Sequence, residues 1–223
     1  MTPLLRRVYG MFLAFVAVYL GFVTWQGSSW HKEHLYRQLL AGSEQQRIAA
    51  AFDLAYVNGE DQLLRALRSR SPEVRVVAVN SLWNLWMRAG GHRAYRQVQA
   101  ANRAIERKAY PEALEILTWL TRTYPEFPEG WNRRATLYWE LGHFEQSLAD
   151  ARKVVALNPH HFAAWEGMGM CLVHLGDVGE ACRCLEAALK INPHDPSLRG
   201  WLRRCQELQH LFAPENHGPV DTI

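Results

Sequence analysis

The sequence lacks the short motifs that mark the commonest classes of enzyme. It contains no GxSxG, P-loop, HExxH or glycine-rich nucleotide turn in its 223 residues. It also lacks a strong charge of one sign: 25 basic and 22 acidic side chains leave a net charge of +3, too small to favour nucleic-acid binding. We therefore expect a protein that is not an enzyme, needs no cofactor, and binds neither nucleic acid nor a small-molecule substrate.

Cysteine is scarce, and its spacing does not fit a metal site. The four cysteines are Cys171, Cys182, Cys184 and Cys205, and no CxxC pair occurs. Cys182 and Cys184 could be combined with His174, but residues two apart on a helix do not face each other, and the spacing of zinc ligands is absent. We expect no metal and predict that the cysteines pack in a core. A Cys171–Cys182 disulfide is the alternative in an oxidising compartment.

Proline recurs with a fixed period in the C-terminal half. Pro125, Pro159 and Pro193 are 34 residues apart. The same period relates other positions with identical or size-matched residues: Trp131/Trp165, Ala135/Gly169, Leu141/Leu175, Gly142/Gly176 and Asn158/Asn192. The small pair lets two helices approach closely, the glycines end a helix in the left-handed conformation, and each Asn-Pro stops the next helix. The pattern predicts stacked helix pairs.

This 34-residue period with its aromatic, glycine and proline landmarks resembles the tetratricopeptide repeat (TPR). The resemblance implies an all-α, right-handed α-solenoid that mediates protein–protein interaction. Its first repeat departs from the pattern, because Lys108 stands where the other two repeats have glycine. The expected parts are three repeats over 94–195 (94–127, 128–161 and 162–195), a capping helix at 196–212 and a flexible tail at 213–223.

The segment 31–91 shows a second, fainter regularity. Ser43 and Ser71 are 28 residues apart, each can cap a helix, and Pro72 then takes the first helical position. The stretch SPEVRVVAVNSLWNL resembles the first helix of a HEAT repeat. We therefore expect juxtamembrane and HEAT-like helices here, with Trp83 and Trp86 packed at the junction with the first TPR.

The N-terminal residues 1–30 contain a long uncharged stretch. Val8 to Trp30 has no formally charged residue, and its core is long enough to cross about 27 Å of hydrocarbon as a helix. This predicts a transmembrane anchor that contacts the membrane through residues 8–25; a cleaved secretory signal is the alternative. Because Arg6 and Arg7 precede the stretch, the positive-inside rule favours an exported solenoid. We expect a single-pass protein of the bacterial inner membrane with its solenoid in the periplasm.

The resemblance also implies where a partner binds. In TPR proteins the concave groove is lined by exposed positions of the first helix of each pair. One subgroup grips the C-terminal carboxylate of chaperones with two Asn, two Lys and one Arg; here only Asn102 matches, and the other places hold Val98, Arg133, Ala163 and Gly167, so no such clamp is expected. The groove positions in this sequence are Val98, Asn102, Ile105, Asn132, Thr136, Trp139, Glu166, Met170 and Val173.

Three functions fit these features. The first is a membrane-anchored scaffold or assembly factor of the cell envelope that holds a partner peptide or helix in its groove, with Trp139 as an anchor; packing of Trp139 against a neighbouring helix is the alternative for this residue. The second is a permanent structural subunit of a larger membrane complex. The third, an organellar import receptor, has a similar layout but lacks the clamp residues. The histidines that fall at repeat turns and helix ends are expected to be solvated; they are His143, His160, His161, His174 and His194.

Overall fold

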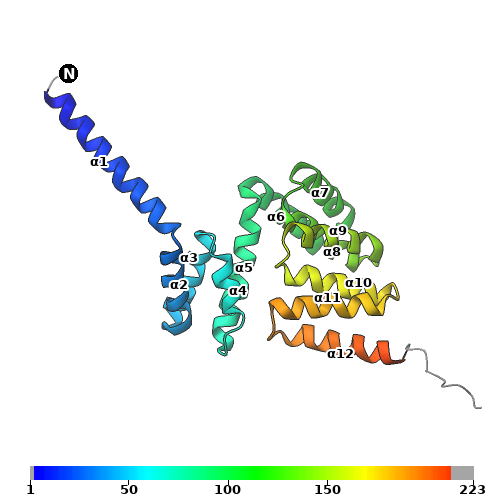
Figure 1. The fold of residues 1–223 in the computed structure, drawn as a ribbon. Helices are drawn as coiled ribbons and strands as arrows, with labels where there is room; N and C mark the ends of the chain where they lie inside the picture. The colour runs from blue at the N-terminus through cyan, green and yellow to red at the C-terminus, as the bar shows by residue number, and fades with distance from the viewer. Residues whose placement is uncertain (1–2, 212–223) are drawn as a thin grey trace, which may run out of the picture. The chain divides into compact units, whose positions relative to one another are not determined.

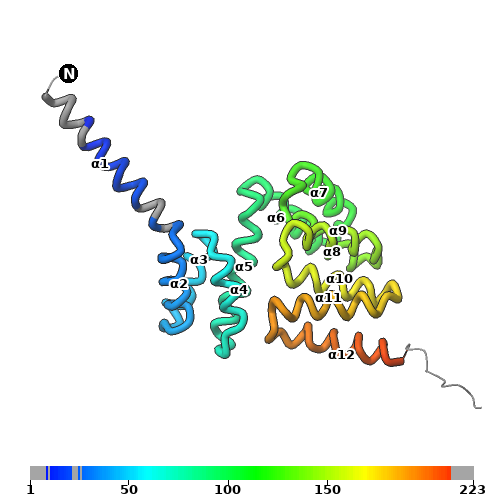
Figure 2. The backbone as a smooth tube through the Cα atoms, in the orientation of Figure 1, coloured from blue at the N-terminus to red at the C-terminus, as the bar shows by residue number. Residues whose placement is uncertain are grey.

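The computed structural model describes residues 3–211, without the side chains of residues 3–8, 10, 22–24 and 26. Every regular element in this part of the chain is an α-helix, and the helices are labelled α1 to α12 in Figures 1 and 2. The residue contacts divide the chain into two compact units, Met1–Leu85 and Trp86–Ile223. The predicted tail at 213–223 lies outside the described residues.

The helices of the first unit are α1 (Pro3–Gln26), α2 (Ser29–Ala41), α3 (Glu44–Tyr56), α4 (Glu60–Ala66) and most of α5 (Pro72–Ala89). The second unit contains α6 (Gly91–Glu106), α7 (Tyr110–Thr123), α8 (Pro128–Glu140), α9 (Phe144–Leu157), α10 (Phe162–His174), α11 (Val178–Ile191) and α12 (Pro196–Leu211).

Serine caps begin two helices of the first unit. Ser43 and Gln46 form a reciprocal capping box at the start of α3, so two backbone N–H groups that lack helical partners are satisfied. At the start of α5 the Ser71 hydroxyl accepts from the Val74 N–H at 3.3 Å. Both predicted caps are confirmed. Three fully buried leucines, Leu39 of α2, Leu54 of α3 and Leu63 of α4, form part of the core of this unit.

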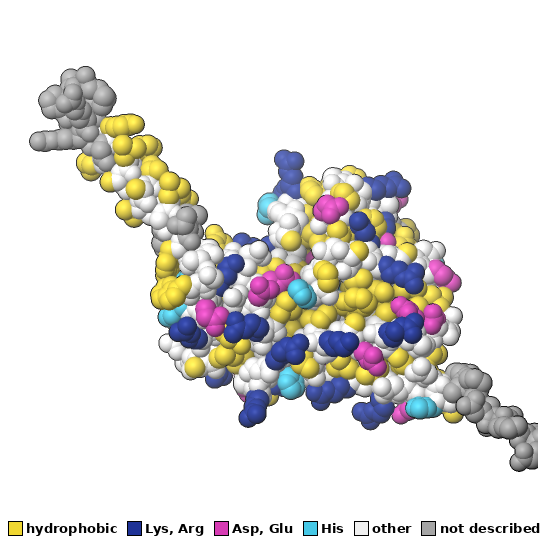
Figure 3. Space-filling model, viewed as in Figure 1, with side chains coloured by type: hydrophobic (Ala, Val, Ile, Leu, Met, Phe, Trp, Pro, Cys, Tyr) yellow, Lys and Arg dark blue, Asp and Glu magenta, His cyan; other side chains and the backbone are white. Residues whose placement is uncertain are grey.

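The described part of α1 does not meet the requirement for a membrane span. Within the residues whose side chains are described, no helix is long and apolar enough to cross a bilayer, contrary to the predicted anchor at residues 8–25. Figure 3 shows apolar side chains along this helix, and several of them are exposed. Location in the bacterial envelope stays a prediction.

In the second unit, the first helix of each pair ends with the same backbone turn, and these turns are one period apart. The backbone φ is positive at Gly142 (77°), at Gly176 (86°) and also at Lys108 (59°). At each turn the next N–H donates to the carbonyl five residues earlier, for example His143 N–H to Tyr138 O at 2.8 Å. Lys108 therefore takes the left-handed conformation that glycine takes in the other two repeats, and the first repeat keeps the geometry although it departs in sequence.

The prolines that set the period accept a repeated hydrogen bond. The Trp131 indole N–H donates to the Pro125 carbonyl at 2.9 Å, and 34 residues later Trp165 donates to the Pro159 carbonyl at the same distance. One further period on, the Arg199 guanidinium donates to the Pro193 carbonyl at 2.6 Å. Because Arg199 belongs to α12, the capping helix continues the register of the repeats.

The expected close approach of paired helices occurs at Gly169 of α10. A Cβ atom built on this residue would lie 2.7 Å from Leu185 Cγ of α11, which is closer than side chains approach in proteins. The corresponding Ala135 of α8 faces Ser147, whose hydroxyl donates to the Ala135 carbonyl at 2.8 Å. The small residues of the repeat therefore set the spacing within each helix pair.

We expect Gly169→Ala to lower the free energy of unfolding by about 1–3 kcal/mol, because Leu185 is fully buried and has little room to move. Gly167→Ala on the same helix is the matched control: no atom lies within 4 Å of its added Cβ, and removing a helical glycine is expected to stabilise by up to about 1 kcal/mol. Urea denaturation of both variants measures the difference. Equal stability of the two would contradict the close approach.

Candidate functional site

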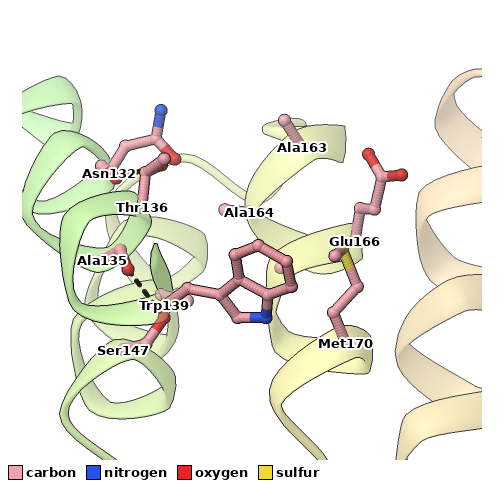
Figure 4. A pocket seen from close by; sticks show the side chains of 11 residues that line it. Asn132, Ala135, Thr136, Trp139, Ser147, Ala163, Ala164, Glu166 and Met170 are labelled. Atoms are coloured by element: carbon pink, nitrogen blue, oxygen red, sulfur yellow. Dashed lines mark hydrogen bonds between the residues drawn. The ribbon is translucent and has the colours of Figure 1, made fainter. Parts of the chain in front are cut away.

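A pocket lies between the second and third helix pairs. Its volume is about 200 Å³, and α8, α9 and α10 line it. Figure 4 shows the Trp139 ring in the space between α8 and α10, with Glu166 and Met170 on the α10 side. The lining residues are Asn132, Ala135, Thr136, Trp139, Ser147, Ala151, Ala163, Ala164, Glu166, Gly167 and Met170. Most of them are small or apolar, so the pocket has an apolar body with a few polar groups at its wall.

Trp139 is the largest side chain of the pocket. It is half-buried, packs against the core of the third repeat, and meets the His174 ring edge-on with 6.4 Å between ring centroids. Its indole N–H is buried and has no hydrogen-bond partner among the described residues. An unpaired buried donor costs about 1–3 kcal/mol, so this N–H lacks the compensation that a hydrogen bond would give.

The other polar groups of the pocket wall offer acceptors. The Asn132 side-chain N–H donates to the Glu129 carboxylate at 3.2 Å, which leaves the Asn132 amide oxygen to accept. The Thr136 hydroxyl donates to the Asn132 carbonyl at 3.0 Å, so the lone pairs of its oxygen can also accept a hydrogen bond. The Glu166 carboxylate accepts from the Ser197 hydroxyl of α12 at 3.2 Å and keeps further acceptor capacity. The pocket therefore presents more acceptors than donors.

Glu166 is an unusual carboxyl in this setting. Burial raises its pKa above the ordinary value, the hydrogen bond from Ser197 opposes that rise, and the nearby charge of Asp195 adds to it. A carboxyl that is partly deprived of water is stabilised by a positive charge placed beside it. A basic group of a ligand would supply that charge.

The folded state holds the Glu166 proton more tightly than the unfolded state does. The contribution of Glu166 to the stability of the fold is therefore lost as the pH rises from about 4.3 through the raised pKa. We expect Glu166→Gln to raise the midpoint of thermal unfolding at pH 7 by about 1–2 °C. At pH 3.5 the two proteins should melt together, since the carboxyl is then neutral in both states. Glu145→Gln, at an exposed position of α9, is the control. An equal gain at both pH values would rule out the ionised carboxylate as the cause.

A buried hydrogen-bond network supports the pocket. His161, at the N-cap of α10, is fully buried; its Nδ1 accepts from the Ala164 N–H at 3.1 Å, so its Nε2 carries the proton and donates to Glu129 at 2.8 Å. The Trp86 ring stacks on the imidazole with 4.6 Å between centroids. Glu129 is also fully buried and binds Asn132. The network therefore fixes two residues of the pocket wall, Asn132 and Ala164.

The network corrects one sequence prediction and adds to another. His161 was expected to be solvated at a repeat turn, but it is buried because its ring closes the gap between α8 and α10 and satisfies Glu129. Trp86 was expected to pack at the junction with the first repeat; its ring also contacts His161 and Phe162 at the start of the third, a contact that the sequence did not predict.

The structure brings together five of the nine predicted groove residues around the pocket; they are Asn132, Thr136, Trp139, Glu166 and Met170. Val98 is fully buried in the core between α6 and α7, so the prediction that it is exposed is wrong: Ala94, Val98 and Ala101 form one buried stripe of α6. Ile105 and Val173 pack at the edges of the two cores, and Asn102 is half-buried away from the pocket lining. A role in binding stays a prediction for every one of these residues.

Sequence reasoning missed the small residues that make the pocket hollow. Ala163, Ala164 and Gly167 leave room on α10 beside the Trp139 ring, and Ser147 and Ala151 do so on α9. The available signal was the presence of Ala163 and Gly167 at two positions where the clamp subgroup has polar residues. The feature that marks the site is thus a set of small side chains next to Trp139, whose indole N–H has no hydrogen-bond partner among the described residues.

The prediction that the cysteines pack in a core is confirmed. All four are buried and carry free thiols, as core packing requires. Cys171 donates to the Ser147 hydroxyl at 3.2 Å and makes no bond to Cys182, so the alternative of a Cys171–Cys182 disulfide is not realised. In the part of the chain that the structure describes, no three His, Cys, Asp or Glu side chains gather as metal ligands.

Comparison with known proteins adds to this geometry. A family model described as "Tetratricopeptide repeat" matches residues 132–196. A TPR repeat-containing protein of Rhizobium etli is 34% identical over 159 residues, which is 71% of this chain and 74% of the relative. The protein SGT1 homolog of Bos taurus is 33% identical over 103 residues, and that match covers 46% of this chain but only 30% of the relative.

A solved structure shares the fold. The first TPR of Spaghetti, bound to the HSP90 peptide SRMEEVD, has a TM-score of 0.51 and 24% identity, over 52% of this chain and 93% of the other. These comparisons give no support to the predicted HEAT-like character of residues 31–91. The helix pairs, the 34-residue period and the extent of the Rhizobium match together show that this chain belongs to the tetratricopeptide repeat proteins.

Proposed function

We propose that this protein is an interaction module that binds an extended segment of a partner protein at the Trp139 pocket. The observation that carries the proposal is the unpaired, buried indole N–H of Trp139 in the wall of a mostly apolar pocket. Such a residue combines a large apolar surface with a hydrogen-bond donor, which is the combination typical of anchoring positions in protein interfaces.

The size of the pocket supports a side chain as occupant. At about 200 Å³ it is smaller than the 300–1,000 Å³ typical of pockets for drug-sized ligands and cofactors. One large apolar side chain can fill the space between Trp139, Ala163 and Gly167. Burial of that side chain would contribute about 1.5–3 kcal/mol, so further contacts along the groove are needed for useful affinity.

The polar groups favour an extended segment over a helix. A helix satisfies its own backbone N–H and C=O groups, whereas an extended chain leaves them free to bond. The Asn132 amide oxygen and the Thr136 hydroxyl can accept from backbone N–H groups of such a segment. The Trp139 indole N–H can donate to a backbone carbonyl after rotation of its ring.

The charges favour a basic segment over an acidic tail. Glu166 faces the pocket with a raised pKa, and a Lys or Arg of the partner beside it would relieve the cost of its ionisation. Arg133, which stands at one of the clamp positions, lies 3.7 Å from the Glu129 carboxylate, which already neutralises it. The site therefore suits an apolar side chain next to a basic one, and not the carboxylate-rich end of a chaperone.

Selection from a random peptide library displayed on phage, with the full chain as target, tests the proposal. We expect enriched peptides to carry a large apolar residue next to Lys or Arg and to bind with micromolar Kd by fluorescence anisotropy. Gly167→Leu fills the pocket and should weaken this binding at least tenfold, while Gly200→Ala on α12, where an added Cβ meets nothing within 4 Å, should leave it unchanged. Enrichment of acidic C-terminal tails, or equal binding by both variants, would contradict the proposal.

A further inference from the structure

Two cysteine sulfur atoms meet between the last repeat and the capping helix. Cys182 of α11 donates its S–H to Cys205 Sγ of α12 at 2.6 Å, and Cys205 in turn donates to the Val178 carbonyl at 3.3 Å. Both thiols are buried, at 5% and 1% exposure. Sulfur atoms that are not bonded ordinarily stay well beyond this separation, whereas a disulfide bond is about 2.05 Å long. The backbones of α11 and α12 thus already hold the pair within reach of a bond.

We propose that Cys182 and Cys205 are a disulfide site that staples α12 to the third repeat when an oxidant of the disulfide class is present. The Cys182 thiolate attacks one sulfur of the oxidant RSSR, and one RS⁻ leaves with the bonding electron pair. The Cys205 thiol then loses its proton to solvent and attacks Cys182 Sγ, which expels the second RS⁻. Two cysteines lose two electrons, and one RSSR is reduced to two RSH.

The other two cysteines do not compete for this bond. Cys171 is engaged with the Ser147 hydroxyl. Cys184 is two residues from Cys182 on α11, so the two side chains point in different directions. Cys184 is also buried, and burial raises its pKa to about 11. The pairing is therefore specific to Cys182 and Cys205, and it differs from the Cys171–Cys182 pairing that was the alternative to core packing.

The staple would act on the last helix that the structure describes. In α12, Leu198 and Cys205 are buried, and Trp201 and Leu202 pack partly buried against the same core. Helices at the end of a chain are the ones that open locally most easily. α12 also carries Ser197, whose hydroxyl donates to Glu166 at the wall of the pocket. The covalent bond joins residues 23 apart and restricts opening of α12. Oxidation would therefore hold Ser197, which donates a hydrogen bond to Glu166, in place at the wall of the pocket.

Burial controls how the bond forms. Burial raises the pKa of the Cys205 thiol to about 12, so it is protonated at neutral pH in the closed structure. α12 must move away before an oxidant can reach either sulfur. The bond is therefore expected to form quickly during refolding and slowly in the folded protein.

The test refolds the full chain with a mixture of oxidised and reduced glutathione and then blocks free thiols with a maleimide in denaturant. We expect two blocked cysteines instead of four, a tryptic peptide pair joined through Cys182 and Cys205, and at least tenfold slower hydrogen exchange of the α12 amides. The midpoint of thermal unfolding should rise by about 5–10 °C relative to the reduced protein.

Matched variants separate this pairing from the alternatives. Cys171→Ser and Cys184→Ser should keep the bond and the exchange protection of α12, whereas Cys182→Ser should abolish both. Because circular dichroism shows whether each variant is helical, a variant that fails to fold is recognised and replaced by Cys205→Ala. Four reactive thiols after oxidative refolding, or a joined Cys171–Cys182 peptide, would overturn the proposal.

Discussion

Replacing His161 by alanine is expected to lower the free energy of unfolding of the second unit by about 3 kcal/mol. The imidazole is fully buried and donates to a Glu129 carboxylate that is itself fully buried. Removal of the ring takes away one partner of a buried charge and leaves a cavity beneath the Trp86 ring. It also removes one of the two acceptors of the Ala164 N–H, which keeps only its bond to the His161 carbonyl at 3.0 Å. These three losses act in the same direction.

Urea denaturation followed by circular dichroism measures this loss, and the adjacent residue supplies the control. His160 is exposed, and only its backbone N–H bonds to Asn158, so His160→Ala should change the stability by less than about 0.5 kcal/mol. A cycle with Glu129→Gln should show coupling of at least about 1 kcal/mol between Glu129 and His161. Additive effects, or similar losses for the two histidines, would mean that the buried pair does not hold α8 and α10 together.

Replacing Trp139 by alanine is expected to weaken binding of a library-selected peptide by about 30-fold or more, the loss typical of an aromatic anchor at the centre of an interface. Trp139→Phe keeps an aromatic ring but removes the indole N–H, so it should lose about fivefold, the worth of one hydrogen bond. Because Trp139 is only half-buried and lines the pocket, both variants are expected to remain folded. Fluorescence anisotropy with a labelled peptide gives the Kd of each.

Trp119 provides a matched tryptophan control. It is 47% exposed on α7 and lines a second hollow with Leu114, Thr118 and Arg122. Trp119→Ala should therefore leave the affinity within twofold of wild type. If Trp119→Ala loses affinity while Trp139→Ala keeps it, the partner binds at the surface of α7 and the proposed pocket is wrong.

The sequence predicted those parts of the fold that follow from its period. The glycine turns, the helix pairs and the close approach at Gly169 all follow from side-chain size and backbone preference at fixed spacing. Even the departure at Lys108 was located correctly, and the structure shows that the backbone keeps the left-handed conformation there. Local chemistry determines such features, so a single sequence contains them.

Features that depend on contacts between repeats could not be predicted in this way. His161 and Glu129 are 32 residues apart, and neither has a like residue one period away that would mark the pair. Cys182 and Cys205 meet because α12 has a particular rotation on α11, which the 34-residue period does not determine. Val98 was assigned to the groove by register alone, but its place between Ala94 and Ala101 puts it in the core.

The most direct test of binding at the Trp139 pocket is to follow the indole N–H signals of the full chain by ¹H–¹⁵N NMR during titration with a selected peptide. The chain has nine tryptophans, and Trp139→Phe assigns the signal of interest. We predict that the Trp139 signal moves downfield as its N–H gains an acceptor, and that its shift exceeds those of all other indoles, Trp119 included. An unchanged Trp139 signal at saturating peptide, with shifts confined to other tryptophans, would contradict binding at this pocket.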